Sequence, residues 1–384
     1  MAKSTFALET PLREQLDRLA AFAPTNAPVL SLYLDARSDQ NGQRTYEPFV
    51  RKTFTERART FTDEARTSFD RDASRIGEYL SGQLKPSTKG VAIFACSAAS
   101  LFEAVQLEVP IEAHWLFIGS VPHLYPLARV NDQHPRYAVL LVDTNSARIF
   151  VFGLGTAETR QQVSNVKTRK TSVGGWAQAR YQRHVENFHL HHMKEVVDVL
   201  DRVVRDEKLT QVLVSCDEVT KPTLMQHLPK HLAEKIVDTV RLDINAPDRE
   251  VIAQTLEVLR ENDAGTDAAR VQTMLDAWRA GGLGVAGVED TMMALAMGQV
   301  EELLITATPE LLARARSLPP NLVTPGPVEI DTSAPRAQAN ADLMKLADEL
   351  VTKAQQSSAR IRFVENPDLL AGVGGVGAIL RFRI

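Results

Sequence analysis

The residues best suited to chemistry lie in one short stretch, 171–188, which reads TSVGGWAQARYQRHVENF. Gly174 and Gly175 have no side chains and can take positive φ, so the backbone there can approach a ligand closely. The amide of Gln178 is not a strong general base, but it can orient a water molecule or an oxyanion. Trp176 can stack on a base or a ribose, or it can pack back on the following helix. Each glycine or glutamine alone is also compatible with a plain turn before a surface helix.

Basic residues surround this stretch. Between Thr159 and Arg183 the sequence contains no Asp or Glu, whereas the whole chain has a formal net charge of −4. The basic residues of this window are Arg160, Lys167, Arg169, Lys170, Arg180 and Arg183. Phosphate backbones attract such a local patch through counterion release. The alternative is a solvated loop, the common environment of a charged run.

The neighbouring sequence predicts how these residues are held. Residues 156–173 are polar and have no hydrophobic period, which predicts a loop, and loops of this length are usually functional or disordered. From about 177 to 206, apolar residues recur at helical spacing. The glycines would therefore stand at a helix N-terminus, where unpaired N–H groups favour anions. His184 falls on this helix beside the basic residues.

The rest of the chain alternates between strands and helices, which predicts an α/β layer fold. We expect strands at 29–36, 91–96, 101–109, 114–120, 136–155 (a hairpin), 211–216, 237–243, 302–307, 359–364 and 378–384. We expect helices at 10–23, 46–84, 177–206, 221–236, 248–262, 267–282, 288–300, 309–318 and 341–356. The proline-rich stretch 319–335 predicts a surface loop. Three domains are expected, at 1–134, 135–263 and 264–384.

A family resemblance joins these observations. GGWAQARYQRHVENFHLHHMKEV resembles the region around the Gly-Gly-Gln motif of the archaeo-eukaryotic class I release factor and Pelota superfamily. RYAVLLVDTNSARIFVFGLG and VLVSCDEVTKPTLMQHLP resemble that family's middle domain. GVEDTMMALAMGQVEELLI and DLLAGVGGVGAILRF resemble its third domain. The resemblance covers about 136–384, implies a bacterial branch, and includes no stop-codon-reading motif in the N-terminal domain.

The resemblance implies a fold and a set of site residues. It predicts an N-terminal α/β domain, an RNase-H-like middle domain that carries a GGQ-like loop, and a C-terminal α/β/α sandwich similar to kink-turn-binding ribosomal proteins. In the family, the loop enters the peptidyl-transferase centre and its Gln helps to place the water that attacks the peptidyl-tRNA ester. Gly174 and Gly175 match the two glycines. Trp176 stands in the slot of the family's Gln, and Gln178 lies two residues later.

Two functions follow as hypotheses. The first is a ribosome-associated peptidyl-tRNA hydrolase acting on stalled ribosomes or large subunits, with Gly174, Gly175 and Gln178 as catalytic residues. In this hypothesis the RNA-binding residues are Lys167, Arg169, Lys170, Trp176, Arg180, Arg183 and His184. The second is a non-catalytic ribosome-binding factor for hibernation or splitting, of the Pelota or Balon type. A translational GTPase is a further partner that the resemblance leaves open.

Other sequence patterns are weaker indications of a functional site. His189, His191 and His192 lack i, i+4 spacing and favour contact with RNA or neighbouring helices over a metal site. Two G-x-G-x-x-G matches, 282–287 and 372–377, lack the strand–turn–helix context of a dinucleotide site. A nuclease would need carboxylates at strand ends, where Asp143 is the obvious candidate. Cys216 is expected to be an inert thiol at the end of a strand.

Composition sets the broad class. The chain has 384 residues, of which 44% are hydrophobic and 24% charged, as in ordinary globular proteins. Its two cysteines are far apart in sequence and suit a reducing compartment. We find no signal-peptide pattern and no apolar run of the roughly 18 residues that a membrane span needs. The expectation is a cytoplasmic protein without a cofactor or a membrane contact.

Overall fold

The computed structural model describes residues 12–38, 44–153, 156–164, 176–309, 312, 329–331 and 337–383, and only the backbone at 156–160, 164, 176–188, 329–331 and 337–342. The chain divides into two compact units. One is His134–Gly265, and the other combines Met1–Gln133 with Thr266–Ile384. Three sheets give a mixed α/β fold, which confirms the predicted class. The predicted division into three domains stays a prediction.

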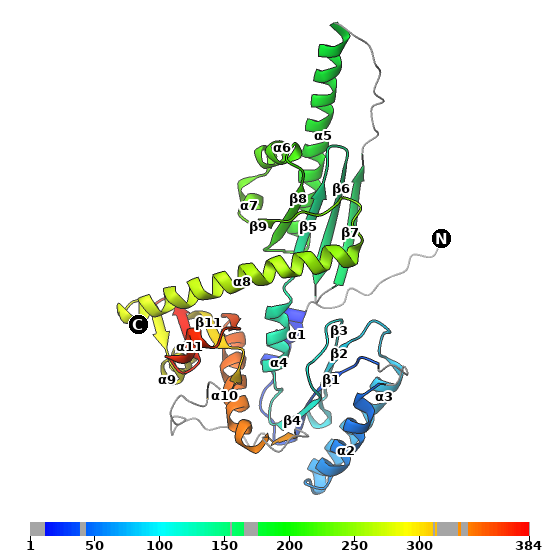
Figure 1. The fold of residues 1–384 in the computed structure, drawn as a ribbon. Coiled ribbons are helices and arrows are strands. Elements are labelled where there is room, and N and C mark those ends of the chain that lie inside the picture. The colour runs from blue at the N-terminus through cyan, green and yellow to red at the C-terminus, as the bar shows by residue number, and fades with distance from the viewer. Residues whose placement is uncertain are drawn as a thin grey trace. The chain divides into compact units, whose positions relative to one another are not determined.

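The unit His134–Gly265 contains a five-stranded sheet with the order β7-β6-β5-β8-β9. Its strands are β5 (Tyr137–Val142), β6 (Ser146–Gly153), β7 (Thr156–Ser164), β8 (Val212–Cys216) and β9 (Ile236–Thr239). β5, β6 and β7 are antiparallel neighbours, whereas β8 is parallel to both β5 and β9. The carboxyl ends of β5, β8 and β9 therefore share one edge of the sheet (Figure 1).

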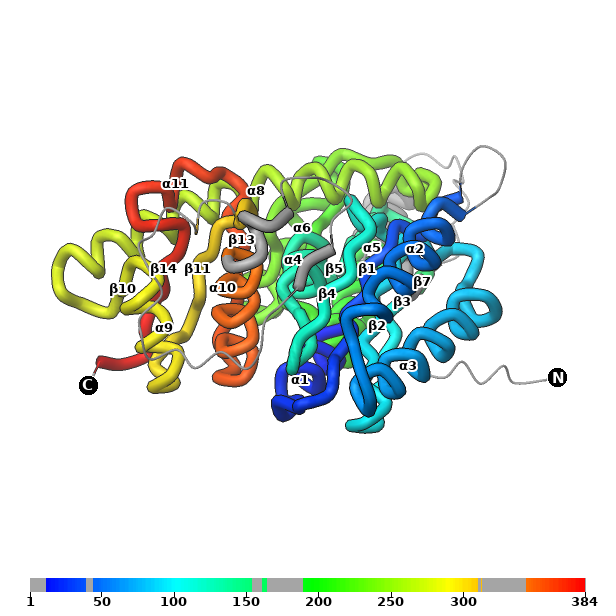
Figure 2. The backbone as a smooth tube through the Cα atoms, turned by 90° about the horizontal axis from the view of Figure 1, so that it is seen from below, coloured from blue at the N-terminus to red at the C-terminus, as the bar shows by residue number. Residues whose placement is uncertain are grey.

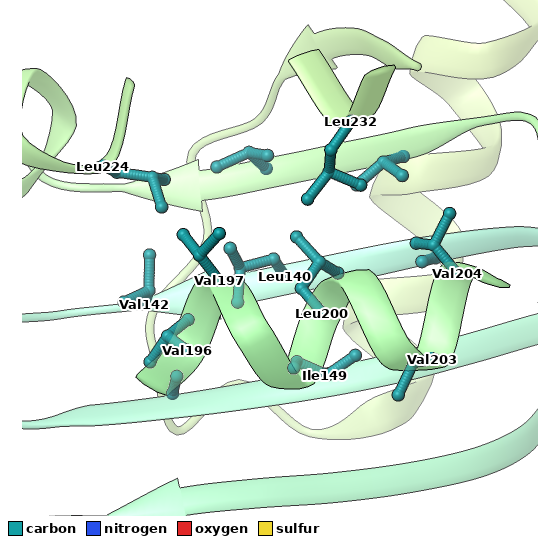
Figure 3. Packing of buried hydrophobic residues seen from close by; sticks show 14 of the residues in the cluster. Leu140, Val142, Ile149, Val196, Val197, Leu200, Val203, Val204, Leu224 and Leu232 are labelled. Carbon is teal, nitrogen blue, oxygen red and sulfur yellow. The ribbon is translucent and has the colours of Figure 1, made fainter. Parts of the chain in front are cut away.

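Helix α5 (Trp176–Asp206) covers one face of this sheet. Val196, Leu200 and Val203 of α5 recur at helical spacing and are at most 4% exposed. They pack against strand residues such as Leu140 and Ile149 (Figure 3). The short helices α6 (Thr220–His227) and α7 (Lys230–Ala233) add Leu224 and Leu232 to the same cluster. This burial fixes the C-terminal half of α5, because apolar contact is the main stabilising term of such a layer.

The opposite face packs against the long helix α8 (Asp248–Arg279). Val251 and Leu259 meet Val139 and Leu213 in a second cluster. The hydroxyl of the buried Tyr137 lies 2.9 Å from Thr255 Oγ1, so the polar ends of both side chains are satisfied within the core.

The other unit begins with an antiparallel sheet of order β12-β4-β1-β2-β3. Its strands are β1 (Val29–Asp35), β2 (Gly90–Cys96), β3 (Leu101–Leu107), β4 (Trp115–Gly119) and β12 (Glu329–Asp331). Helices α2 (Tyr46–Ala58) and α3 (Asp63–Gly82) pack on one face, where Phe69 and Ile76 are fully buried (Figure 2). The N-terminal helix α1 is Leu12–Ala20, and a single 3-10 turn, η1, covers Ser97–Ala99.

A second sheet of this unit has the order β10-β14-β11-β13. The strands are β10 (Gly284–Ala286), β11 (Val300–Thr306), β13 (Arg360–Val364) and β14 (Val376–Leu380). The helices around it are α9 (Val288–Ala296), α10 (Ala337–Gln356), α11 (Asp368–Ala371) and the end of α8. Val271 and Met274 of α8 join Leu304, Val364 and Leu370 in its core.

Helices α4 (Tyr125–Gln133) and α10 join the two sheets of this unit, and they lie side by side (Figures 1 and 2). Asp348 of α10 is buried and accepts hydrogen bonds from the backbone N–H groups of Leu124, at 2.5 Å, and Tyr125, at 3.0 Å. The Tyr125 hydroxyl donates to the carbonyl of Thr306 at 3.0 Å. The N-terminal and C-terminal parts of the chain therefore share one polar junction.

Several predicted elements were wrong, among them the helix predicted at 221–236, which the structure divides into α6 and α7. Residues 156–164 form the edge strand β7 rather than a loop, and among its described side chains (161–163) only Val163 is buried, so the strand shows no hydrophobic period. The predicted helix 46–84 breaks into α2 and α3, and Phe61 in the connection stacks on Phe69 at 5.3 Å. The helices predicted at 248–262 and 267–282 are one helix, α8, despite Gly265 in its middle.

Candidate functional site

The structure describes the predicted site only in part. Lys167, Arg169, Lys170, Gly174 and Gly175 lie outside the described residues. The other predicted residues, which are Trp176, Gln178, Arg180, Arg183 and His184, are positions in the first turns of α5, where the backbone alone is described. Because α5 begins at Trp176, the two glycines directly precede its first turn. That turn leaves backbone N–H groups without a partner inside the helix.

The first turns of α5 have two distinct stripes, because each residue of an α-helix advances by about 100°. Trp176, Arg180, Arg183 and His184 fall within an arc of about 100° and therefore share one stripe. Gln178 falls on the opposite side of the helix. The candidate RNA contacts and the candidate water-positioning amide thus belong to different stripes of the same helix.

In the half of α5 whose side chains are described, the two stripes differ in their exposure to solvent. His191, Lys194, Asp198 and Arg202 continue the stripe of Arg180, and all four are exposed. His189, His192, Val196 and Leu200 continue the stripe of Gln178, and of these only His189 is not fully buried. In this described half, the helix therefore turns the stripe of Arg180 (the cationic stripe) away from the sheet and the stripe of Gln178 toward it.

Two histidines begin the buried part of the second stripe. Nδ1 of the half-buried His189 lies 2.8 Å from the carbonyl oxygen of Thr144. His192 is 0% exposed and faces the backbone of Ser146. Both contacts reach the turn Asp143–Ser146, which joins β5 to β6. A strand connection therefore contacts His189 and His192, and the predicted contact of these histidines with RNA or neighbouring helices stays a prediction.

The turn itself is tightly hydrogen-bonded. Asp143 Oδ1 accepts from the backbone N–H groups of Asn145 and Ser146, both at 2.7 Å. The Asp143 N–H donates to the Ser146 carbonyl at 2.9 Å. A carboxylate that accepts two local N–H bonds holds an Asx-type turn in one shape. α5 is therefore anchored to a rigid part of the sheet.

The anchor is sensitive to charge. Burial lowers the pKa of His192, and the nearby His189 lowers it further, whereas the Ser146 backbone, Asp143 and Glu195 raise it. Burial dominates because an imidazolium without enough hydrogen-bond partners is costly in a low-dielectric environment. Nε2 of His192 is buried and has no hydrogen-bond partner. The folded protein therefore favours the neutral ring.

The strand ends also bear on the nuclease alternative. Asp143 and Asp217 follow the adjacent parallel strands β5 and β8. Asp143 holds the turn described above, and Asp217 Oδ1 accepts from the Thr220 N–H at 2.6 Å at the start of α6. Over the side chains that the structure describes, no group of three His, Cys, Asp or Glu residues could hold a metal ion. Burial raises the pKa of the half-buried Cys216 thiol, which disfavours the nucleophilic thiolate.

Sequence reasoning missed the anchoring role of His189 and His192. The signal was present in their spacing, because Val196, Leu200 and Val203 continue the same stripe of the helix. Considered as a cluster of three, these histidines suggested contact with RNA or neighbouring helices. Considered by helical position, only His191 belongs to the exposed stripe.

Comparison with known families identifies two matching segments. Residues 122–260 match "Bacterial archaeo-eukaryotic release factor family 10", and residues 266–384 match "eRF1 domain 3". The eukaryotic peptide chain release factor subunit 1 of Stylonychia lemnae is 22% identical over 307 residues, covering 72% of this chain and 67% of the relative. The peptide chain release factor subunit 1 of Methanopyrus kandleri is 25% identical over 211 residues, covering 53% of this chain and 51% of its own length.

Solved structures of the same group also align. An archaeal translation termination factor, aRF1, shares 18% identity over 97% of both chains, with a TM-score of 0.26. Archaeal Pelota, in a model of the ribosome-bound protein with ABCE1, shares 14% identity over 97% of this chain and 94% of that one, with a TM-score of 0.41. Scores this low carry no argument, so the relationship rests on the sequence matches. No helix among the described residues is long and apolar enough to cross a membrane.

Proposed function

We propose, from the premise that the chain belongs to the bacterial archaeo-eukaryotic release factor family and is a release-factor-like translation protein, that it hydrolyses the peptidyl-tRNA ester on stalled ribosomes or large subunits. The observation that carries the proposal is the position of the GGWAQ segment. It stands directly before and within the first turn of α5, inside the segment that matches the family.

In the proposed reaction the protein places a water molecule rather than forming a covalent intermediate. The water oxygen attacks the ester carbonyl carbon, and the bond from that carbon to the ribose oxygen of the tRNA breaks. The products are a peptide carboxylate and a tRNA with a free hydroxyl, which takes up a proton. The Gln178 amide orients the water, and Gly174 and Gly175 allow the backbone to come close to the ester.

The cationic stripe has a separate task in this proposal. Arg180, Arg183 and His184, with Lys167, Arg169 and Lys170 before them, bind ribosomal RNA or the tRNA acceptor end. Trp176 stacks on a base or a ribose at the same side of the helix. Because this stripe is exposed along the described half of α5, a nucleic acid can approach it without displacing the core. We also propose that the middle domain is RNase-H-like and that the third domain is similar to kink-turn-binding ribosomal proteins.

A second function is favoured by one observation, the position of Gln178. Trp176 stands where the family's motif has its Gln, and Gln178 lies two residues further on. If this shift removes the amide from the ester, the protein binds ribosomes without hydrolysis, as a hibernation or splitting factor. A translational GTPase partner is compatible with both functions.

The test is release of labelled peptide from stalled ribosomes and from large subunits that carry peptidyl-tRNA. Gln178→Ala should lower the release rate by about 10²-fold or more, as the loss of a water-orienting group does, while co-pelleting with ribosomes changes little. Gln182→Ala is the matched control, since it removes the same side chain one helical turn later. Binding without release by the wild type would establish the second function, and neither binding nor release would refute both.

The role of the basic residues has its own test. Charge reversal at Arg169 and Lys170 should weaken ribosome binding and reduce its dependence on salt, because fewer counterions are released. Reversal of Arg249, an exposed residue outside the basic stretch, is the control. Co-pelleting across a salt series measures both quantities. Equal salt slopes for the wild type and the Arg169/Lys170 variant would contradict the assignment.

A further inference from the structure

Exposed apolar side chains gather at one end of the sheet β10-β14-β11-β13. Among the described residues seven large apolar side chains are exposed, and five of them belong to the segments at this end. The five are Trp278, Leu283, Met293, Met297 and Phe382. Single exposed apolar side chains are ordinary, whereas a contiguous group is typical of an interaction surface.

Backbone hydrogen bonds bring three of these side chains to one edge of the sheet. The last N–H of β14 donates to the Leu283 carbonyl at 2.9 Å, and the following N–H, of Arg381, donates to the Gln299 carbonyl at 2.8 Å. Leu283 directly precedes the edge strand β10, and Phe382 follows Arg381. Met297 closes α9 two residues before Gln299. The three side chains therefore come from backbone segments that lie side by side.

Helix α9 lies beside β10 and β14 (Figure 2) and turns one stripe of side chains toward solvent. The members of this stripe are Glu289, Asp290, Met293, Ala296 and Met297, and all of them are exposed. They fall within an arc of about 120°, since each residue of an α-helix advances by about 100°. Met293 is 58% exposed and Met297 is 49% exposed. The middle of the stripe is therefore an apolar helix face that no described residue covers.

Charges of opposite sign stand at the two ends of this stripe. Glu289 and Asp290 occupy the first turn of α9, and neither forms an ion pair with a described residue. Beyond the other end of α9, the exposed Arg381 and Arg383 donate to backbone carbonyl oxygens and to no carboxylate in the described part of the chain. From Asp290 to Met297 the helix rises by about 10 Å. The apolar stripe thus separates an acidic end from a basic end.

We propose that a second copy of this chain docks on this surface and that the two copies form a homodimer. The surface, which we call the α9 face, consists of Leu283, the exposed stripe of α9 and residues 381–383. In the dimer the two α9 helices pack antiparallel about a two-fold axis close to Met293. Two-fold symmetry then brings the acidic end of each copy to the basic end of the other, with the apolar side chains of both copies between them. The α9 face is self-complementary in charge, which is what an isologous interface requires.

The dimer should be weak and should depend on salt. The apolar part of the α9 face is smaller than a standard interface, which has about 20–30 residues on each side. We therefore expect a dissociation constant of about 1–100 µM at low salt. Burial of the methionines and Phe382 supplies the attraction, whereas the exposed charge pairs set the antiparallel orientation and weaken as salt screens them. The inference does not depend on peptide release.

Sedimentation equilibrium of the full chain tests the homodimer. Over protein concentrations of about 1–200 µM, the weight-average mass should rise from that of one chain toward that of two. Met293→Glu should raise the dissociation constant at least about tenfold, because it places two carboxylates beside each other at the axis of an apolar contact. Met225→Glu is the matched control, since Met225 is an exposed methionine on α6, outside the α9 face, and it should leave the constant unchanged.

Two results would overturn the homodimer on this face. The first is a wild type that keeps the mass of one chain at every concentration, which would leave the α9 face to a protein of different sequence. The second is equal dissociation constants for Met293→Glu and Met225→Glu, which would place the interface elsewhere. Circular dichroism checks that each variant is folded, and Met297→Glu replaces Met293→Glu if that variant is not.

Exchange of the charges tests the antiparallel arrangement. One variant carries Glu289→Lys and Asp290→Lys, and the other carries Arg381→Glu and Arg383→Glu. Each variant alone brings like charges together at both ends of the interface, so its dissociation constant should rise about tenfold or more. In an equimolar mixture both contacts again join opposite charges, and heterodimers should form with nearly the wild-type constant. Wild-type strength of either folded variant alone, or no recovery in the mixture, would overturn the antiparallel arrangement.

Discussion

The junction around Asp348 makes the sharpest stability prediction. Its carboxylate accepts from two backbone N–H groups at the start of α4, and His123 Nδ1 lies 3.3 Å away. The site is buried, so water cannot replace a lost acceptor. Asp348→Ala would leave the Leu124 and Tyr125 N–H groups without a partner and remove a negative charge from a helix N-terminus.

The expected loss follows from these contacts. A hydrogen bond to a charged group contributes about 1.5–3 kcal/mol, and two are lost, so Asp348→Ala should lower the free energy of unfolding by about 3–6 kcal/mol. At about 2–4 °C per kcal/mol for a unit of this size, the Tm should fall by about 6–24 °C. Asp348→Asn keeps one acceptor oxygen and should lose about 1–2 kcal/mol.

Differential scanning calorimetry of the full chain measures both changes. Glu301→Gln, an exposed carboxylate on β11, is the control and should shift the Tm by about 1–2 °C at most. Because the junction joins segments from both ends of the chain, the transition that moves should be that of the unit containing α4 and α10. A Tm for Asp348→Ala equal to that of the control would refute the reasoning that this junction holds the unit together.

Two further predictions concern α8. Gly265→Ala should stabilise the protein by about 0.5–1 kcal/mol in urea unfolding, because Gly265 is helical and no atom lies within 4 Å of the position that the alanine Cβ would take. A lower urea midpoint for the variant would contradict a continuous helix at this position. Thr255→Val should lower the free energy of unfolding by about 1–3 kcal/mol, because the Tyr137 hydroxyl loses its partner at 2.9 Å. Thr255→Ser keeps a hydroxyl and should lower it less. Equal stability of the two variants would show that the hydrogen bond contributes little.

Element types followed well from the sequence where periodicity was strong. The strands at 29–35, 90–96 and 212–216 are apolar runs, and the structure buries them almost completely. The predicted elements were wrong where packing between distant residues, rather than local sequence, determined the secondary structure. The segment Asn262–Asp267 has turn-type residues, but packing at both ends of α8 continues the helix through Gly265 at a cost of about 1 kcal/mol. β7 is polar because its only described buried side chain is Val163.

Residue types and the family resemblance predicted the candidate site. The structure adds which side of α5 each position occupies and where the helix contacts the sheet. Residue spacing placed Gln178 and Arg180 on a helix, and α5 now assigns them to opposite stripes. The anchoring of His189 and His192 on a turn more than 40 residues earlier could not follow from local pattern, because it depends on how β5 and β6 pack against α5.

The most direct test of the central claim is the fate of the water oxygen. Large subunits that carry peptidyl-tRNA are incubated with the protein in H₂¹⁸O, and the released peptide is weighed by mass spectrometry. Hydrolysis predicts one ¹⁸O atom in the peptide carboxylate, with release that depends on the protein and is lost in Gln178→Ala. Peptide that stays on tRNA while the protein remains bound to the subunit would contradict hydrolysis and establish a binding factor.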